Sequence, residues 1–230
     1  ATAAFVAVKV GDFVKDAVST YSDFNQAMAN TSAIAGANEE QMKKLENAAL
    51  EMGKKTTKTA TEASEALGYM ALAGWDVDTS IASLEPVLRL SEATQMDLAT
   101  CSDLVTDSMS ALGLTADQLT DYLNVTCQAN NKSNTTAQAL MEAMIGCGGA
   151  AKSAGMDYKQ TAAALGILAN NGVKGAEAGT ALNSMLVRMT TKDVAQKAFK
   201  ELGVSIYDSS GQMRNMQDIL VELNGAMSGL

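Results

Sequence analysis

Proline occurs once in this chain of 230 residues, at position 86. A proline inside an α-helix removes a backbone donor and clashes with the preceding turn, so it is scarce where most of the chain is helix interior. Aromatic residues make up only 4% of the chain, whereas methionine occurs 14 times. Strands favour β-branched and aromatic side chains. The sequence therefore predicts an all-α protein with a core of small and flexible side chains.

Helix starts recur about every twenty residues as a polar N-cap followed three positions later by Glu or Gln. The complete capping boxes are Asn38 with Gln41, Thr59 with Glu62, Thr115 with Gln118, Thr135 with Gln138, and Asp157 with Gln160. Asp78 and Asp97 are predicted to be single-residue caps. Each signal predicts a short helix of about three to four turns.

Apolar residues behind these caps follow the helical period. One example is Leu45, Ala49 and Met52, and the last predicted stripe before residue 204 is Val194, Ala198, Phe199 and Leu202. Five glycines follow such stripes, where a left-handed C-terminal cap favours glycine: Gly74, Gly113, Gly155, Gly172 and Gly203. Pro86 is predicted to lie in the first turn of a helix, after a break near Leu84 or Glu85.

Residues 1–35 contain no clear helix stop before Gly36 and are predicted to form one long helix. One of its faces carries Phe13, Ala17, Tyr21, Phe24 and Met28. This face either packs on the core or associates with other copies of the chain. We expect residues 1–36 to be a lead-in helix and residues 37–230 to be a helical core domain.

Residues 204–214 depart from the helical period. Val204 and Ile206 alternate with Ser205 and Tyr207, and residues 208–211 have turn chemistry. We predict a small β-hairpin here, before a final helix. The regular helix spacing carries no recurring residue signature, so the predicted architecture is an irregular multi-helix bundle rather than a repeat solenoid.

The formal net charge of −9, with no basic run, argues against sequence-specific nucleic-acid binding. The chain has no histidine, which excludes Ser-His-Asp and Cys-His catalysis and ordinary zinc sites. Paired acids such as Glu39 with Glu40 have the spacing of a solvated helix face. We therefore predict that the chain is not an enzyme and has no catalytic, metal or cofactor site.

Cys101, Cys127 and Cys147 are odd in number and lie on apolar stripes, which predicts free core thiols. The chain begins without methionine, and its first residues lack the pattern of a signal peptide. We expect it to be a fragment of a longer protein. No uncharged apolar run reaches the about 18 residues that a membrane span needs.

Gly146, Gly148 and Gly149 lie in one predicted helix, where each glycine costs about 1 kcal/mol relative to alanine. Close contact with a neighbouring helix is the main explanation, and a kink is the second. Trp75 stands beside Asp76 and Asp78 at a predicted helix end. The sequence leaves open whether Trp75 packs in the core or docks a partner.

Residues 165–188 join two apolar helical stripes through Asn170-Asn171-Gly172 and Gly175, and set Gly179-Thr180 inside the second stripe. Residues 202–214, with Gly203 and Gly211, follow at a short distance. Shorter landmarks precede them at residues 24–28, 45–53, 71–75 and 88–93. In this order and spacing, the sequence resembles the conserved core region of phage tail tape-measure proteins.

The resemblance implies a structural virion protein that acts in tail assembly, tail length determination and genome ejection. It implies a place in the tail tube lumen or at the tail tip, and in the host cytoplasm during assembly. The implied partners are the tail tube protein, tail tip or baseplate hub proteins, tail assembly chaperones and further copies of the chain, with transient contact to the host membrane. The motif positions, which we expect to serve packing, are Gly74, Trp75, Gly172, Gly175, Gly179, Thr180, Gly203 and Gly211.

Two alternatives stay open. One is a membrane-active helical domain that assists DNA passage across the envelope, and the other is a generic helical interaction domain. As one continuous helix, 230 residues would span about 345 Å. Because short capped helices fold back on themselves, we expect a folded module rather than the ruler itself.

Overall fold

The computed structural model describes the backbone of residues 2–211 and 213–228, and side chains from residue 15 onward. This described part contains eleven α-helices, one 3-10 turn and no strand, which confirms the all-α prediction. None of its helices has both the length and the apolar character needed to span a membrane. The chain forms two compact units, Ala1–Asp103 and Leu104–Leu230. The division into a lead-in helix, residues 1–36, and a core domain, residues 37–230, is a different grouping and stays a prediction.

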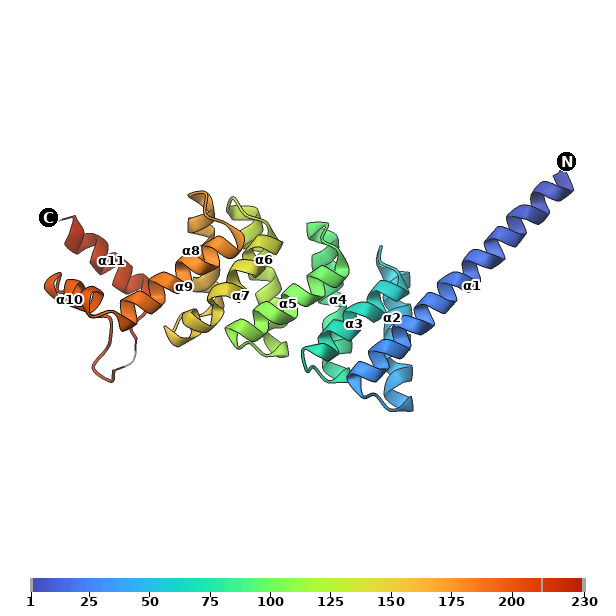
Figure 1. Ribbon diagram of the computed structural model, residues 1–230, viewed down its shortest axis with the longest axis horizontal. Coiled ribbons are helices and arrows are strands. Elements are labelled where there is room, and N and C mark those ends of the chain that lie inside the picture. Colours follow the sequence, from blue (N-terminus) through green and yellow to red (C-terminus); the bar gives the residue numbers. More distant parts are fainter. Residues whose placement is uncertain (1, 212, 229–230) are drawn as a thin grey trace. The chain divides into compact units, whose positions relative to one another are not determined.

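The first unit contains four complete helices and the start of a fifth (Figure 1). They are α1 (Thr2–Ala35), α2 (Glu39–Lys55), α3 (Ala60–Leu72), α4 (Val77–Thr94) and α5 (Leu98–Leu112), whose residues from 104 onward belong to the second unit. The long N-terminal helix is as predicted, and Gly36 follows it at a φ of +58°.

The C-terminal part of α1 packs on α3. Phe24 and Met28 are only 5% and 2% exposed, and the Thr31 hydroxyl donates to the Ser64 carbonyl oxygen at 2.8 Å. Packing on the core is therefore the outcome for these residues. Ala17 and Tyr21, earlier on the same face, are exposed. The side chain of Phe13 lies outside the described residues.

Three predicted capping boxes are present at the starts of α-helices. The backbone N–H of Gln41 donates to the Asn38 side chain at 2.9 Å, and the Asn38 N–H donates back to Gln41 at 3.0 Å. Thr59 and Asp157 form the same reciprocal pairs at the starts of α3 and α8. Asp97 also caps as predicted, because its carboxylate accepts from the Thr100 N–H at 2.9 Å.

Two predicted caps are wrong. The cap of α4 is Asp76, which accepts from the Thr79 N–H at 2.8 Å, whereas Asp78 lies in the first turn. The cap of α7 is Thr136 and not Thr135, whose N–H is already donated to the Ser133 carbonyl at 2.8 Å. In both places adjacent polar residues offer equivalent caps, and the course of the preceding turn selects one. The predicted pair of Thr115 and Gln118 is present, with the Thr115 N–H donating to the Gln118 side chain at 3.1 Å, but it begins a 3-10 turn instead of an α-helix.

The predicted helix break near Leu84 and Glu85 is also wrong, because Pro86 lies inside the continuous helix α4. Pro86 has no N–H to donate to the carbonyl four residues earlier, which costs about 3 kcal/mol in a helix interior. Leu84, Val87 and Leu88 are 1%, 0% and 0% exposed. Burial of these apolar side chains on both sides of the proline offsets its cost.

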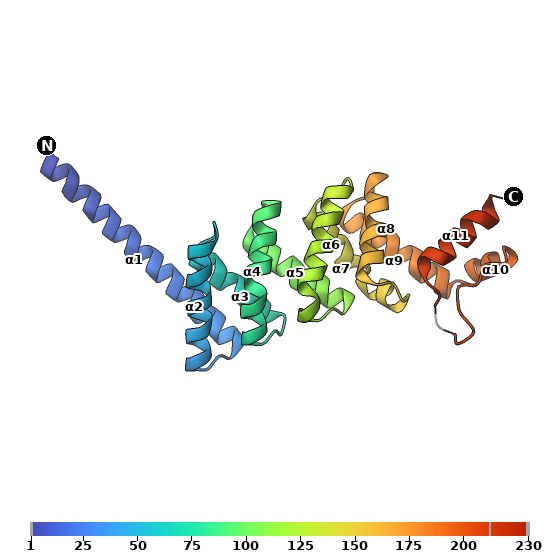
Figure 2. The same cartoon turned by 180° about the vertical axis from the view of Figure 1, so that it is seen from behind.

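The second unit contains the rest of α5 and seven further elements, seen from behind in Figure 2. They are the 3-10 turn η1 (Ala116–Gln118), α6 (Leu119–Lys132), α7 (Ala137–Ser153), α8 (Tyr158–Asn170), α9 (Gly175–Thr191), α10 (Asp193–Glu201) and α11 (Met216–Met227). The core of this unit includes Tyr122, Leu140, Met141 and Met144. The five glycines predicted to end helices all have positive φ.

Two predictions fail near the C-terminus. The expected β-hairpin is reduced, within the described residues, to one antiparallel bridge between Tyr207 and Met213. The predicted apolar stripe of α10 is not buried, since Val194 is 81% exposed and the helix has no buried residue. Periodicity identified this helix correctly but carries no information on whether its apolar side chains are buried.

Candidate functional site

Helices α7 and α9 lie backbone against backbone at Gly179. A Cβ atom added there would lie 2.4 Å from the Ala143 carbonyl oxygen and 3.0 Å from the Ala143 Cα. Gly146 faces the same point, because a Cβ there would lie 3.6 Å from the Gly179 Cα. Such an approach requires glycine, since any side chain at position 179 would overlap the neighbouring backbone.

Asn183 adds a polar contact across the same pair of helices. Its side-chain amide donates to the Gly146 carbonyl oxygen at 3.2 Å. Thr180, beside Gly179, is exposed, and its hydroxyl donates to Ala176 within α9 at 2.9 Å. Asn183 is not among the residues predicted from the sequence. Its position, one helical turn after Gly179, was the available signal.

The other two helical glycines of α7 differ from each other. A Cβ at Gly148 would lie 2.7 Å from the Ala111 carbonyl carbon of α5, so this glycine also permits close helix packing. A Cβ at Gly149 would meet nothing within 4 Å. Close packing accounts for Gly146 and Gly148 but not for Gly149.

The turn between α8 and α9 uses two left-handed glycines. Gly172 has a φ of +92° and ends α8, where the Val173 N–H donates to the Leu168 carbonyl at 3.0 Å. Gly175 has a φ of +57° and begins α9. Asn170 connects this turn to the α6–α7 turn, because its side chain accepts from the Asn134 N–H at 2.8 Å. The motif at residues 170–179 therefore sets the α8–α9 turn and the α9–α7 contact.

Gly74 and Trp75 lie in the other unit. Gly74, with a φ of +84°, and Trp75 end α3 through a bond from the Trp75 N–H to the Met70 carbonyl at 3.1 Å. The Trp75 side chain is partly exposed. This motif thus shapes the α3–α4 turn, and the docking role considered for Trp75 stays a prediction.

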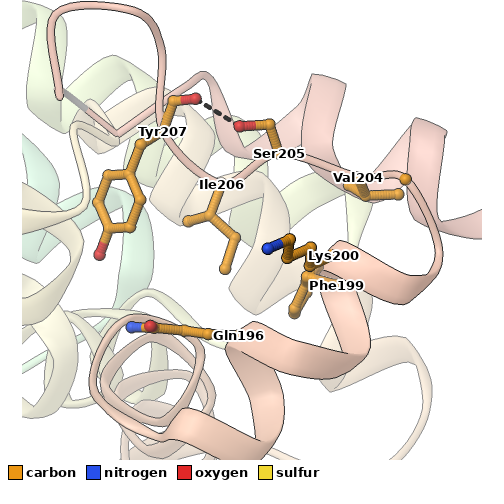
Figure 3. A pocket seen from close by; sticks show the side chains of 8 residues that line it. Gln196, Phe199, Lys200, Val204, Ser205, Ile206 and Tyr207 are labelled. Carbon is orange, nitrogen blue, oxygen red and sulfur yellow. Dashed lines mark hydrogen bonds between the residues drawn. The ribbon is translucent and has the colours of Figure 1, made fainter.

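Gly203 and Gly211 shape the segment after α10. Gly203 has a φ of +71°, and the Val204 N–H donates back to the Phe199 carbonyl at 2.9 Å. Gly211, at +79°, lies in a turn where its N–H donates to the Asp208 carbonyl at 3.1 Å. Between α10 and residues 203–207 lies a hollow of about 360 Å³ (Figure 3). We call this the α10 hollow.

A polar cluster joins α6 to α8 and was also missed in the sequence. The Asp121 carboxylate accepts from the Tyr158 hydroxyl and lies 2.7 Å from the Lys159 Nζ. Hydrogen bonds from Lys159 and then Tyr158 hold the pKa of Asp121 below its ordinary value. The cluster connects two helices at the surface.

Two further carboxylates have their pKa held below its ordinary value, Glu51 by hydrogen bonding to Lys55 and Glu92 by hydrogen bonding to Thr57. A general acid at neutral pH needs a raised pKa instead. None of the three cysteines is in a disulfide, Cys101 and Cys147 are buried, and burial raises the pKa of Cys147 to about 11.

Comparison with known proteins gives these features a context. The sequence profile of the family described as phage-related minor tail protein matches residues 46–230, a range that includes every motif position from Gly74 to Gly211. The chain belongs to this family. As a minor tail protein, it is a structural component of a phage tail.

Two tape measure proteins are similar to this chain, which confirms the resemblance seen in the sequence. The tape measure protein of Pneumococcus phage Dp-1 is 32% identical over 95% of this chain and 19% of its own length. The probable tape measure protein of Escherichia phage P2 is 28% identical over 89% of this chain and 25% of its own length. The chain thus spans a quarter or less of these relatives. No solved structure matches it.

Proposed function

We propose that this chain is a segment of a tape measure protein, whose full length sets the length of the phage tail and which leaves the tail ahead of the genome. The observation that carries the proposal is the 32% identity to a tape measure protein over 95% of the chain. The acidic charge of −9 is compatible with a place in the path of DNA, because like charges limit adhesion.

Within that protein, this segment acts as a folded module and does not itself measure length. A ruler needs length in proportion to residue number, which a continuous helix supplies at about 1.5 Å per residue. The longest described helix has 34 residues, and the other described α-helices have 9 to 18 residues. Such a module supplies binding surfaces. Its proposed partners are the tail tube, the tail tip or baseplate hub, the assembly chaperones and other copies of the chain.

The test is a pair of in-frame deletions in the phage that encodes the chain. Removing helical sequence from the tape measure gene outside this segment should shorten the tails in proportion to the residues lost, as seen by electron microscopy. Removing residues 104–230 should instead stop tail assembly. If the second deletion gave infectious particles with proportionally shorter tails, the segment would be part of the ruler and the module proposal would be wrong.

A further inference from the structure

Helices α9 and α10 are separated by a single residue, Lys192. Its φ of −98° and ψ of 119° are extended, whereas the residues on both sides of it are helical. A continuous α-helix needs a φ of about −63° and a ψ of about −42° at this position. A change at Lys192 alone, chiefly in ψ, would therefore join the two helices.

The residues at this joint do not force the helix to break. Residues 189–196 contain neither glycine nor proline, and Lys192 makes no side-chain capping bond at the start of α10. The hydroxyls of Thr190 and Thr191 donate to carbonyl oxygens one turn earlier, at 3.0 Å and 2.7 Å. Such bonds bend helices without ending them. The break must therefore be held by contacts outside the joint.

The break leaves three backbone hydrogen bonds unmade. The Lys192 N–H still donates to the Arg188 carbonyl at 3.1 Å, and the Gln196 N–H donates to the Lys192 carbonyl at 3.0 Å. A continuous helix would add bonds from the N–H groups of residues 193–195 to the carbonyl oxygens of residues 189–191. Between these described residues, none of the three bonds is formed. Joining the helices would form all three.

Contacts from beyond the joint hold the bend. The Thr190 carbonyl accepts from the Gln196 side-chain amide at 2.7 Å and from the Tyr207 hydroxyl at 3.5 Å. Helix α10 itself has no buried residue. Burial resumes only in the segment that follows it, at Val204, Ile206, Met216 and Ile219. Residues 204–228, and not α10, thus supply the packing that favours the bent form.

This C-terminal segment, residues 204–228, is bordered by two hollows. The α10 hollow lies on one side of its first residues. A second hollow, of about 470 Å³, lies where the segment meets α7 and α9, and its lining includes Ser153, Leu186, Val187, Tyr207 and Met213. Well-packed protein interiors leave few spaces larger than a water molecule. The segment therefore lies against α7 and α9 over a reduced contact area.

We propose that Lys192 is a two-state joint. The chain bends there while residues 204–228 lie against α7 and α9, and α9 and α10 become one helix from Gly175 to Glu201 when that segment is displaced. The joined helix would be about 40 Å long. Extending α9 avoids the cost of nucleation, whereas a separate helix of 9 residues is too short to be stable in water. The proposal goes beyond the tape-measure function and does not rest on it, because it uses only contacts within the second unit.

The test displaces the segment within the whole chain and follows single amides by nuclear magnetic resonance. Ile219 is 0% exposed, so Ile219→Asp places a charge in its contacts and should release residues 204–228. We expect the amides of residues 193–195 to exchange with solvent about tenfold more slowly than in the parent chain, because they gain acceptors. Adding Asp193→Pro should abolish the slowing at residues 194 and 195. Proline fits the first position of α10 but cannot continue α9.

Asp193→Ala is the matched control, because it removes the same charge and leaves the slowing intact. Loss of amide protection in α11 reports release of the segment, and retained protection in α7 shows that the second unit stays folded. If Ile219→Asp also exposes α7, Arg214→Ala replaces it, since Arg214 donates to the Ser205 carbonyl and to Glu222 at 2.8 Å and 2.9 Å.

Four outcomes would overturn the proposal. One is unchanged exchange at residues 193–195 after release. Another is faster exchange throughout residues 196–201, because α10 would then have melted. A third is equal slowing with and without Asp193→Pro. The fourth is retained protection of α11 in both releasing variants, because the segment would then be firmly held.

Discussion

A single carbon atom added at Gly179 would disturb the packing of α9 against α7. The Ala143 carbonyl oxygen would lie only 2.4 Å from a Cβ at position 179. We expect Gly179→Ala to lower the free energy of unfolding by about 1–3 kcal/mol, because the helices must move apart. Gly179→Leu should lower it further. Urea denaturation followed by circular dichroism would measure both changes.

Gly149 provides the matched control within the facing helix. A Cβ at Gly149 meets nothing within 4 Å, and its backbone is helical. Gly149→Ala should therefore stabilise the chain by about 0.5–1 kcal/mol, because alanine loses less backbone entropy on folding. If both substitutions had the same small effect, the α7–α9 contact would be looser than the structure shows.

The contribution of the Asp76 cap to the stability of the fold depends on pH. Hydrogen bonds from the backbone and then the side chain of Thr79 hold the pKa of Asp76 below its ordinary value of 3.8. A lowered pKa in the folded state stabilises the fold above pH 3.8, and this contribution is lost as the pH falls through the lowered pKa. Asp76→Asn keeps a capping side chain but cannot titrate, so the stability difference from the parent chain should shrink on acidification below pH 3.8.

Asp78 is the control for the cap itself. Asp76→Ala should lower the melting temperature at pH 7, and Asp78→Ala should change it less, because only Asp76 accepts from the Thr79 N–H. If Asp78→Ala had the larger effect, Asp78 would be the N-cap of α4, as the sequence predicted.

Capping signals in the sequence predicted helix starts correctly where both partners of the cap lie within one helical turn. Asn38, Thr59 and Asp157 form capping boxes because both partners lie within four residues of each other. Asp76 and Thr136 were missed because a neighbouring residue fits the same pattern and only the three-dimensional course of the chain selects between them. Asn183 and Asp121 were missed because their partners are 37 or more residues away.

At the scale of elements, α4 shows that a strong local signal can be overruled by packing. Pro86 lies within this helix between buried leucines and valine. Pro86→Ala should raise the stability by about 1–2 kcal/mol, since the helix gains a backbone donor while the unfolded chain becomes more flexible. Thermal denaturation would measure it. A lower melting temperature would show that the proline sets a helix shape that the core requires.

The segment after residue 192 shows that a correct local pattern does not predict whether side chains are buried or strands pair. The α10 stripe and the predicted hairpin have correct local patterns, but Val194 stays exposed and only one bridge forms among the described residues. Whether an apolar stripe is buried depends on a second surface, and periodicity carries no information about that surface. The motif at Gly172, Gly175 and Gly179 was found in the sequence. The close contact between α9 and α7 at Ala143, which explains the glycine at position 179, was not predicted.

At the scale of the whole molecule, each unit has a core of its own. Met28 is 2% exposed in the first unit and accepts a hydrogen bond from the Ser64 hydroxyl at 3.0 Å. Met28→Ala should destabilise that unit by about 2–5 kcal/mol. Hydrogen exchange should accelerate in α3, whereas amides of α7 in the second unit should keep their protection. Val18→Ala, at a 64% exposed position of α1, is the control and should leave both unchanged.

The buried thiols have a practical consequence for following these units. Cys101 is 0% exposed in the first unit, and Cys147 is 1% exposed in the second. A thiol reacts with an alkylating reagent as the thiolate, so each of these two cysteines can be modified only while its surroundings are open. Mass spectrometry of timed alkylation would therefore read the opening of each unit separately. Each unit therefore contains a natural cysteine whose rate of alkylation reports how often that unit opens.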